Sequence, residues 1–208
     1  TYMSRIRPFI GNDLVKVLTG IRRSGKSVML DLIKEELCAS GVDSSQFISI
    51  NFENMSNAHL CTATALHEEI IRRASEIKGK VYLFFDEMQE VAAGEKCINS
   101  FRVELDCDMY ITGSNAKLLS GELATYLAGR YVEFVVYPFS FAEFIELYHT
   151  IYPDTDTRQC FSKYLTAGGM PYLSNLRYDE TASRQYLRDL FNSVELKDIV
   201  KRNNIRDG

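Results

Sequence analysis

The chain has 208 residues, of which 46% are hydrophobic and 25% are charged, and its formal net charge is −4. This length and composition are typical of one globular domain with room for a small appendage, and the acidic balance argues against a surface built throughout to hold nucleic acid. No apolar run approaches the length of a membrane span. Five cysteines without a CxxC pair predict buried, reduced thiols and a cytoplasmic protein.

Up to residue 138, short apolar runs alternate with amphipathic segments. Strands are expected at residues 14–19, 47–52, 81–85, 109–113 and 131–136, and helices at 25–39, 62–77, 98–105 and 116–128. This alternation predicts right-handed βαβ units and a parallel sheet with helices on both faces. Beyond it only helices are expected, at 140–152, 158–166 and 181–202. The sequence therefore predicts an α/β core over residues 1–138 and a helical, lid-like extension over residues 139–208.

A loop rich in glycine and arginine follows the first expected strand. Residues 20–27 read Gly-Ile-Arg-Arg-Ser-Gly-Lys-Ser, which fits the pattern GxxxxGK followed by Ser or Thr at every fixed position. Glycine permits turns that a Cβ would obstruct. The loop amides can then form a nest for phosphate oxygens beside the positive end of the following helix.

This pattern predicts a site for ATP and Mg²⁺. Lys26 is expected to bridge the β- and γ-phosphates, and the Ser27 hydroxyl to bind Mg²⁺. One of the two loop arginines is expected to face nucleotide or protein carboxylates, and the other to be solvated. The expected nucleotide-binding residues are Gly20, Ile21, Arg22, Arg23, Ser24, Gly25, Lys26, Ser27 and Val28.

Two acids follow the most apolar run of the chain. Asp86 comes directly after residues 81–85, which would place its carboxylate at the edge of the sheet where ligands of open α/β folds bind. There it would hold Mg²⁺ through the water shell of the metal. Glu87, beside it, would orient and deprotonate the attacking water. The alternative is that both are solvated acids of a surface loop.

Polar side chains also follow the next expected strand. Ser114 and Asn115, favoured over Thr112, could reach the γ-phosphate or the attacking water, although such residues are also common in turns. Arg130 opens the following strand, and its guanidinium could stabilise charge on the transferring phosphoryl group in its own subunit or in a neighbour. The alternative for Arg130 is a surface or salt-bridged arginine.

Residues 137–144, Tyr-Pro-Phe-Ser-Phe-Ala-Glu-Phe, are dense in aromatic side chains. They could offer a stacking platform for bases, but packing between the core and the helical extension is the simpler interpretation. Ser140 and Glu143 have the spacing of a capping box, which predicts a helix start at this point.

Five segments together resemble the prokaryotic predicted AAA-type ATPases, a family in which a P-loop domain precedes a C-terminal domain of unknown function. The segments are VKVLTGIRRSGKS, YLFFDEMQEV, ITGSNAKLLSGELATYLAGR, YPFSFAEF and GGMPYL, and the resemblance covers about residues 14–207. It implies a three-layer P-loop NTPase fold with an extra strand between the phosphate-loop strand and the Asp-Glu strand. It also implies the roles given above for Lys26, Ser27, Asp86 and Glu87. We expect the C-terminal domain of the family to be missing from this chain.

The expected function is that of a Mg²⁺-dependent ATPase whose hydrolysis of ATP changes the conformation of an attached C-terminal domain. One alternative is a slow nucleotide-dependent switch or a nucleic-acid-associated regulatory module, although an acidic chain shows little of the basic surface that such a module needs. A small-molecule kinase shares the phosphate loop, but no acceptor-binding lid rich in arginine is evident. ATP and ADP are the expected ligands. A homo-oligomer and an unknown protein or DNA partner stay open, and no membrane partner is expected.

Overall fold

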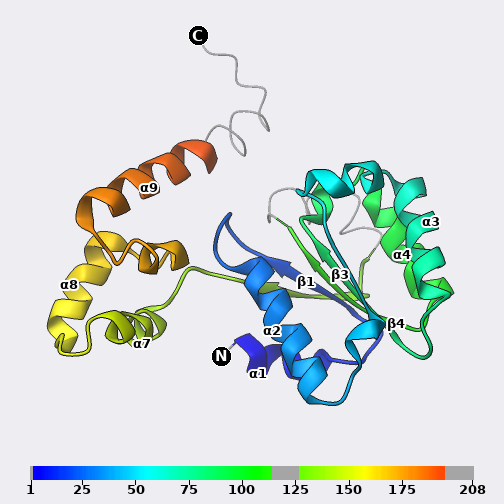
Figure 1. Ribbon diagram of the computed structural model, residues 1–208, viewed down its shortest axis with the longest axis horizontal. Helices are drawn as coiled ribbons and strands as arrows, with labels where there is room; N and C mark the ends of the chain where they lie inside the picture. Colours follow the sequence, from blue (N-terminus) through cyan, green and yellow to red (C-terminus); the bar gives the residue numbers. More distant parts are fainter. Residues whose placement is uncertain (1, 114–126, 195–208) are drawn as a thin grey trace, which may run out of the picture. The chain divides into compact units, whose positions relative to one another are not determined.

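The computed structural model describes residues 2–113 and 127–194 (Figure 1). The chain divides into two compact units, one comprising Thr1–Ile21 and Lys26–Val136, the other Arg22–Gly25 and Tyr137–Gly208. Within the described ranges, no helix combines the length and the apolar character that crossing a membrane requires. Most of the helix expected at 116–128 lies outside the described residues.

The first unit is built on a parallel sheet whose strands follow the apolar runs of the sequence. The strands are β1 (Val15–Thr19), β2 (Phe47–Asn51), β3 (Val81–Asp86), β4 (Cys107–Thr112) and β5 (Tyr131–Val135). Their order is β2-β3-β4-β1-β5, and every neighbouring pair is parallel. Since β4 lies between β1 and β3, the expected extra strand is confirmed.

Helices cover both faces of this sheet, which confirms the expected three-layer fold. The short α1 (Tyr2–Ile6) and α2 (Lys26–Ala39) pack on one face, and α3 (Ala63–Ala74) and α4 (Gly94–Glu104) pack on the other (Figure 1).

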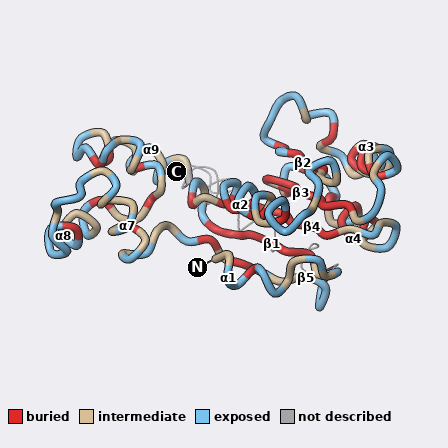
Figure 2. The backbone as a smooth tube through the Cα atoms, turned by 60° about the horizontal axis from the view of Figure 1, so that its bottom comes forward, coloured by how far each residue is buried: buried red, intermediate tan, exposed pale blue. Residues whose placement is uncertain are grey.

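The side chains of β3 alternate between two cores. Tyr82 and Phe84 belong to the core under α2, whereas Leu83 and Phe85 belong to the core under α3 and α4. Because helices cover both faces, β1, β3 and β4 are buried along almost their whole length (Figure 2). Continuous apolar runs are typical of parallel strands in this position.

Lys16 interrupts the apolar run of β1 in the sequence but is fully buried in the structure. Its Nζ lies 2.7 Å from Oδ1 of Asp108 on β4 and donates a hydrogen bond to the carbonyl oxygen of Asn12 at 3.0 Å. The other oxygen of Asp108 accepts from the Gly11 amide at 2.7 Å and from the Tyr110 hydroxyl at 2.8 Å. Burial lowers the pKa of the Lys16 ammonium, and the charge of Asp108 offsets only part of that shift. A buried ion pair therefore joins β1 to β4.

The structure corrects two expectations from the sequence. α4 begins at Gly94, whereas the sequence predicted a start at residue 98. The prediction missed the first turn because it carries few apolar side chains, and these are what reveal a helical period. Gly94 is buried, and a Cβ there would meet the terminal methyl of Met88 at 2.6 Å.

All five cysteines are free, but Cys38 is exposed, contrary to the expectation of buried thiols, whereas Cys97 and Cys160 are buried.

From Tyr137 onward, the described part of the second unit is mainly helical. It contains α7 (Phe141–Ile151), α8 (Thr157–Ala167) and α9 (Glu180–Val194); residues 195–202 of the last expected helix lie outside the described residues. The capping box at the start of α7 is confirmed, since the Ser140 hydroxyl accepts from the Glu143 amide at 3.4 Å and the Glu143 carboxylate accepts from the Ser140 amide at 2.8 Å.

Aromatic side chains from this region pack inside the helical unit. Phe144 is fully buried, and its ring centroid lies 5.2 Å from those of Tyr148, Tyr164 and Tyr178. The Phe141 ring lies 5.4 Å from that of Tyr164. Phe141 and Phe144 therefore belong to the core of the helical unit, and packing of the aromatic segment against the α/β core stays a prediction.

Candidate functional site

Residues 20–27, the expected phosphate-binding loop (called the phosphate loop below), follow β1 and lead into the first turn of α2. The backbone of this loop has positive φ angles at Gly20 (145°), Arg23 (65°) and Gly25 (105°), which glycine adopts readily and other residues rarely. The Lys26 side chain is 4% exposed, and its ammonium donates hydrogen bonds to the carbonyl oxygens of Gly20 and Ile21, both at 3.3 Å. Lys26 is therefore held at the carboxyl end of β1 by the backbone of its own loop.

Asp86 is the last residue of β3 and is 6% exposed. Its Oδ1 accepts a hydrogen bond from the Thr112 hydroxyl at 2.5 Å, and its Oδ2 accepts one from Nδ2 of Asn51 at 2.9 Å. Asn51 and Thr112 end β2 and β4, the two strands that flank β3. Parallel order brings the three strand ends to one edge, so the carboxylate lies between two neutral donors.

Glu87 follows β3 in the left-handed conformation, with φ 58° and ψ 49°. Its amide donates to the Thr112 hydroxyl oxygen at 3.0 Å. Oε1 of its carboxylate lies 3.7 Å from Nζ of Lys26, and Oε2 accepts a hydrogen bond from Nε2 of Gln89. Gln89 belongs to the short 3-10 helix η4 (Met88–Glu90). The structure therefore places the loop lysine beside the second acid of the strand end.

Thr112 is the polar residue that links the two acids, although the sequence favoured Ser114 and Asn115. Both of these lie outside the described residues. Asn51 and Gln89 were missed by the sequence analysis. The only signal for Asn51 was a polar residue at the end of an expected strand, and no pattern pointed to Gln89.

Arg130 lies at the opposite edge of the sheet. Its carbonyl oxygen accepts from the Val15 amide at 3.0 Å, at the start of β1, whereas Gly20 follows the end of that strand. The strand has five residues, or about 16 Å at about 3.3 Å per residue, which exceeds the reach of an arginine side chain. The guanidinium donates to Oδ1 of Asn99 on α4 at 3.3 Å. Arg130 is therefore separated from the phosphate loop of its own chain.

The loop residues fit a nucleoside triphosphate with Mg²⁺. Ser24 is 4% exposed, and its hydroxyl has no hydrogen-bond partner among the described residues, so a phosphate oxygen would satisfy a buried donor. Ser27 is exposed at the start of α2, and its hydroxyl and the Asp86 carboxylate are the hard oxygen ligands that Mg²⁺ prefers. Ile21 and Val28 are exposed, at 52% and 60%, and offer apolar surface beside the loop.

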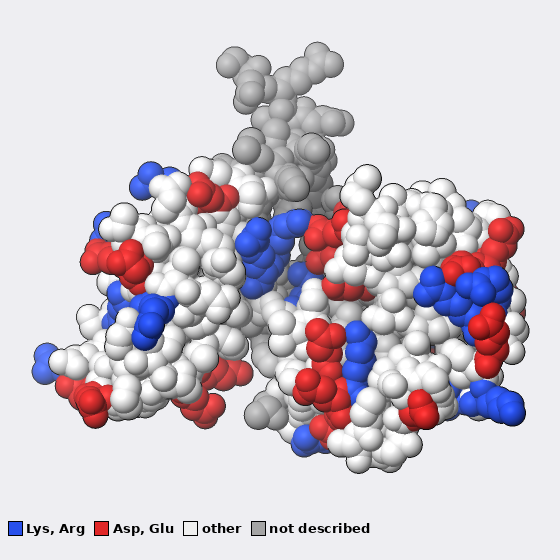
Figure 3. Space-filling view, viewed as in Figure 1, with Lys and Arg blue, Asp and Glu red and all other residues white. Residues whose placement is uncertain are grey.

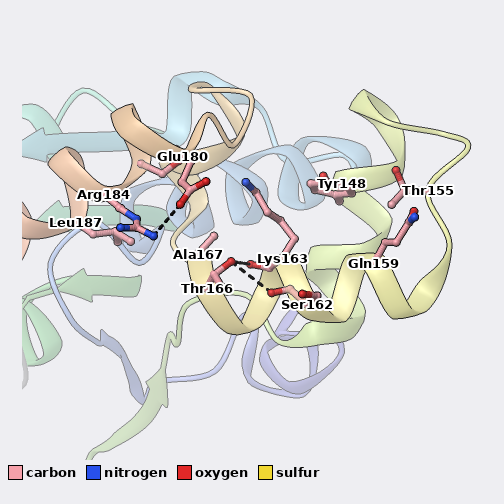
Figure 4. Close-up of a pocket in the computed structure, with 11 residues that line it drawn as sticks. Tyr148, Thr155, Gln159, Ser162, Lys163, Thr166, Ala167, Glu180, Arg184 and Leu187 are labelled. Atoms are coloured by element: carbon pink, nitrogen blue, oxygen red, sulfur yellow. Dashed lines mark hydrogen bonds and ion pairs between the residues drawn. The ribbon is translucent and has the colours of Figure 1, made fainter.

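A separate cavity lies within the helical unit (Figure 4). It has a volume of about 520 Å³ and is lined by residues of α7, α8 and α9, among them Lys163 and Arg184. Arg184 pairs with Glu180 at 2.7 Å, as Figure 4 shows. None of the residues expected to bind nucleotide lines this cavity, so it is distinct from the phosphate loop.

A parallel sheet of this strand order, with a phosphate loop after β1 and an acidic pair at the end of β3, defines a P-loop domain of the ATPase type. The chain belongs to the AAA domain family, whose family model matches residues 12–145.

Two relatives match almost the whole chain. An uncharacterized protein of Haemophilus influenzae is 37% identical over 209 residues, which are 99% of this chain and 51% of that protein. An uncharacterized protein of Methanocaldococcus jannaschii is 31% identical over 204 residues, 93% of this chain and 43% of that protein. The chain therefore spans about half the length of the curated relatives that it matches.

Solved structures share the fold at low sequence identity. AMPPCP-bound DnaA from Aquifex aeolicus superposes with a TM-score of 0.55 at 12% identity, covering 96% of this chain and 63% of that chain. The Orc1 protein of Aeropyrum pernix in complex with DNA gives a TM-score of 0.53 at 13% identity, covering 89% and 64%. At this level of identity the likeness shows the fold alone.

Proposed function

We propose that this domain binds ATP with Mg²⁺ and hydrolyses it to ADP and inorganic phosphate. The observation that carries the proposal is the distance of 3.7 Å between Nζ of Lys26 and Oε1 of Glu87, two mostly buried side chains at the carboxyl edge of the sheet. Phosphoryl transfer to water needs a cation for the phosphates and a base for the water near the same γ-phosphate. These two residues, next to Asp86, supply both.

In the proposed step, the oxygen of a water attacks the γ-phosphorus. An oxygen–phosphorus bond forms while the bond from the γ-phosphorus to the bridging oxygen of the β-phosphate breaks. The proton of the water passes to the Glu87 carboxylate, which acts as the general base. Lys26 offsets negative charge on the β- and γ-phosphates, and the loop amides orient the transferring group.

Ser27 and Asp86 are the residues that would hold Mg²⁺. Bound there with the nucleotide, the ion would neutralise negative charge on the phosphate oxygens. Asn51 and Thr112 would keep the Asp86 carboxylate in place, because each donates a hydrogen bond to one of its oxygens.

The position of Arg130 leads us to propose that the domain works as a homo-oligomer. Since Arg130 lies at the opposite edge of the sheet from its own phosphate loop, its guanidinium would stabilise the transition state at the nucleotide of a neighbouring copy. From the resemblance to a family in which a P-loop domain precedes a C-terminal domain, we also propose that hydrolysis changes the conformation of an attached C-terminal domain.

A slow, nucleotide-dependent switch on nucleic acid is the competing proposal. On the face of the described residues shown in Figure 3, basic and acidic side chains are interspersed. A protein surface that binds nucleic acid usually gathers Lys and Arg into a patch or stripe. That face shows no such patch, so the experiment below also includes duplex DNA.

Phosphate release from ATP and Mg²⁺, together with calorimetric ATP binding, tests the proposal on the full-length protein. Lys26→Ala should weaken ATP binding by about tenfold or more, since it removes charge-assisted contacts to phosphate, and should abolish release. Lys78→Ala is the matched control, because Lys78 is exposed between α3 and β3, and it should behave like the parent. Chelation of Mg²⁺ should stop turnover.

The possible outcomes distinguish an ATPase from a nucleotide-dependent switch and from a small-molecule kinase. Equal ATP affinity in the parent and in Lys26→Ala would show that this loop is not the nucleotide site. ATP binding without phosphate release, with or without duplex DNA, would favour the switch. Transfer of phosphate to a small molecule instead of release would indicate a kinase.

A further inference from the structure

Gln89 makes an unusual hydrogen bond beside the acidic pair. Its Nε2 donates to Oε2 of Glu87, while its own Oε1 is buried and accepts no hydrogen bond from any described residue. Gln46 lies in a similar short 3-10 helix and has both ends of its amide satisfied, since Nε2 donates to the Lys80 carbonyl at 2.9 Å and Oε1 accepts from the Asp43 amide at 3.3 Å. A buried, unpaired acceptor costs free energy, so the contact with Glu87 must offset the cost of leaving the Gln89 oxygen unpaired.

The charge of Glu87 fixes the orientation of the Gln89 amide. If the amide were turned over, its oxygen would face a carboxylate oxygen, and two acceptors would then be in contact. The left-handed backbone at Glu87 and the tight turn of η4 place the two side chains side by side although they are only two residues apart. Gln89 thus satisfies Glu87 and leaves its own oxygen unpaired.

The two oxygens of the Glu87 carboxylate have different partners. Oε1 faces Lys26 at 3.7 Å, and Oε2 is held by Gln89, while the Glu87 amide is held by the Thr112 hydroxyl at 3.0 Å. Phosphates in the loop would compete for Lys26. Once Lys26 turned to them, Oε1 would lose this cation, whereas the contacts to Gln89 and Thr112 would persist.

We propose, on the basis of the proposed hydrolysis, that Gln89 is the positioning residue of the general base. It holds Oε2 of Glu87, so that Oε1 is the oxygen left to take the proton of the attacking water. Gln89 gains and loses no proton in this step; its N–H donor fixes the plane of the carboxylate. Fixed orientation of a reacting group is a large part of catalysis, and a misplacement of about 1 Å can cost about 10²-fold in rate.

Gln89→Met in the full-length protein tests this role. Methionine has a similar length, and it removes the donor together with the unpaired acceptor. We expect kcat to fall by about 10–10²-fold, with KM changed less than about twofold, and the melting temperature to stay the same or rise. Gln46→Met is the matched control: it removes a fully satisfied glutamine away from the acidic pair, and should lower the melting temperature while leaving kcat unchanged.

A double-mutant cycle with Glu87→Gln separates positioning from a structural role. If Gln89 acts through Glu87, Gln89→Met should lower the single-turnover rate of the parent but not that of the Glu87→Gln chain. An equal loss in both backgrounds, or no loss in the parent, would overturn the assignment to Gln89 alone. A parent protein no faster than Glu87→Gln would overturn the proposed hydrolysis as well.

Discussion

Replacing Glu87 with glutamine should slow hydrolysis and tighten ATP binding at the same time. Nζ of Lys26 and Oε1 of Glu87 are 3.7 Å apart, and the two side chains are only 4% and 12% exposed. A nucleotide must draw Lys26 away from this carboxylate before the ammonium contacts phosphate. Glutamine keeps the shape of the side chain but removes the charge that competes for Lys26.

The size of the effect follows from the geometry of the pair. Two unit charges at this separation attract each other by about 4–5 kcal/mol at an effective dielectric constant of about 20. Desolvation of the two charges offsets most of this attraction, and we take the remainder as about 1 kcal/mol, the upper end of the scale measured for exposed ion pairs. Removing a competitor of that strength should tighten ATP binding by about fivefold. Loss of the general base should lower the hydrolysis rate by about 10²–10⁴-fold.

Calorimetric titration with ATP and Mg²⁺ gives the affinity, and single-turnover phosphate release gives the rate. Glu68→Gln removes the charge of an exposed acid on α3 and should match the parent in both measurements. A Glu87→Gln chain that bound ATP more weakly than the parent would refute the competition for Lys26. One that hydrolysed ATP at the parental rate would show that Glu87 is only a surface acid.

Two further predictions concern the opposite edge of the sheet. Asp108→Ala should lower the free energy of unfolding, measured in urea, by about 3–5 kcal/mol, because Lys16 keeps a buried charge without its partner. Asp108 raises the pKa of Lys16 against the lowering caused by burial, so the folded variant releases the Lys16 proton at a lower pH than the folded parent. The stability of the variant should therefore rise more steeply with pH, and the loss should shrink toward pH 10.5; equal losses at neutral and alkaline pH would contradict this. Arg130→Ala should lower turnover more than ATP affinity, and turnover per chain should rise with protein concentration. Mixing Arg130→Ala chains with Glu87→Gln chains should restore some activity, because each variant supplies the residue that the other lacks. If the mixtures stay inactive, Arg130 has only a structural role.

The sequence predicts most of the first unit because its elements carry local signals. The run at residues 81–85 is apolar throughout, and the loop at residues 20–27 has fixed spacing, so both could be placed on a parallel sheet by the βαβ rule. The role of Lys16 could not be predicted in this way. It depends on Asp108, which is 92 positions away in the chain, and a single lysine in a strand gives no hint of its partner.

The candidate site is predictable only where its residues belong to a motif. Lys26, Asp86 and Glu87 belong to such patterns, and their catalytic roles stay predictions. The hydrogen bond of Asn51 depends on which strands flank β3, and that of Gln89 depends on the left-handed backbone at Glu87. The spacing of residues in the sequence shows neither. A positive φ at a residue other than glycine is uncommon, so a sequence pattern does not anticipate it.

Two buried aspartates on adjacent strands show how surroundings separate a structural acid from one suited to a metal. Asp108 lies 2.7 Å from the ammonium of Lys16, so its charge is neutralised within the chain. Among the described residues, the donors to the Asp86 carboxylate are a side-chain amide and a hydroxyl, and no lysine or arginine pairs with it. Lys26, at the same edge, faces Glu87 instead. Because a buried carboxylate without a counter-charge is unfavourable, a divalent cation would supply the positive charge that Asp86 lacks and Asp108 already has.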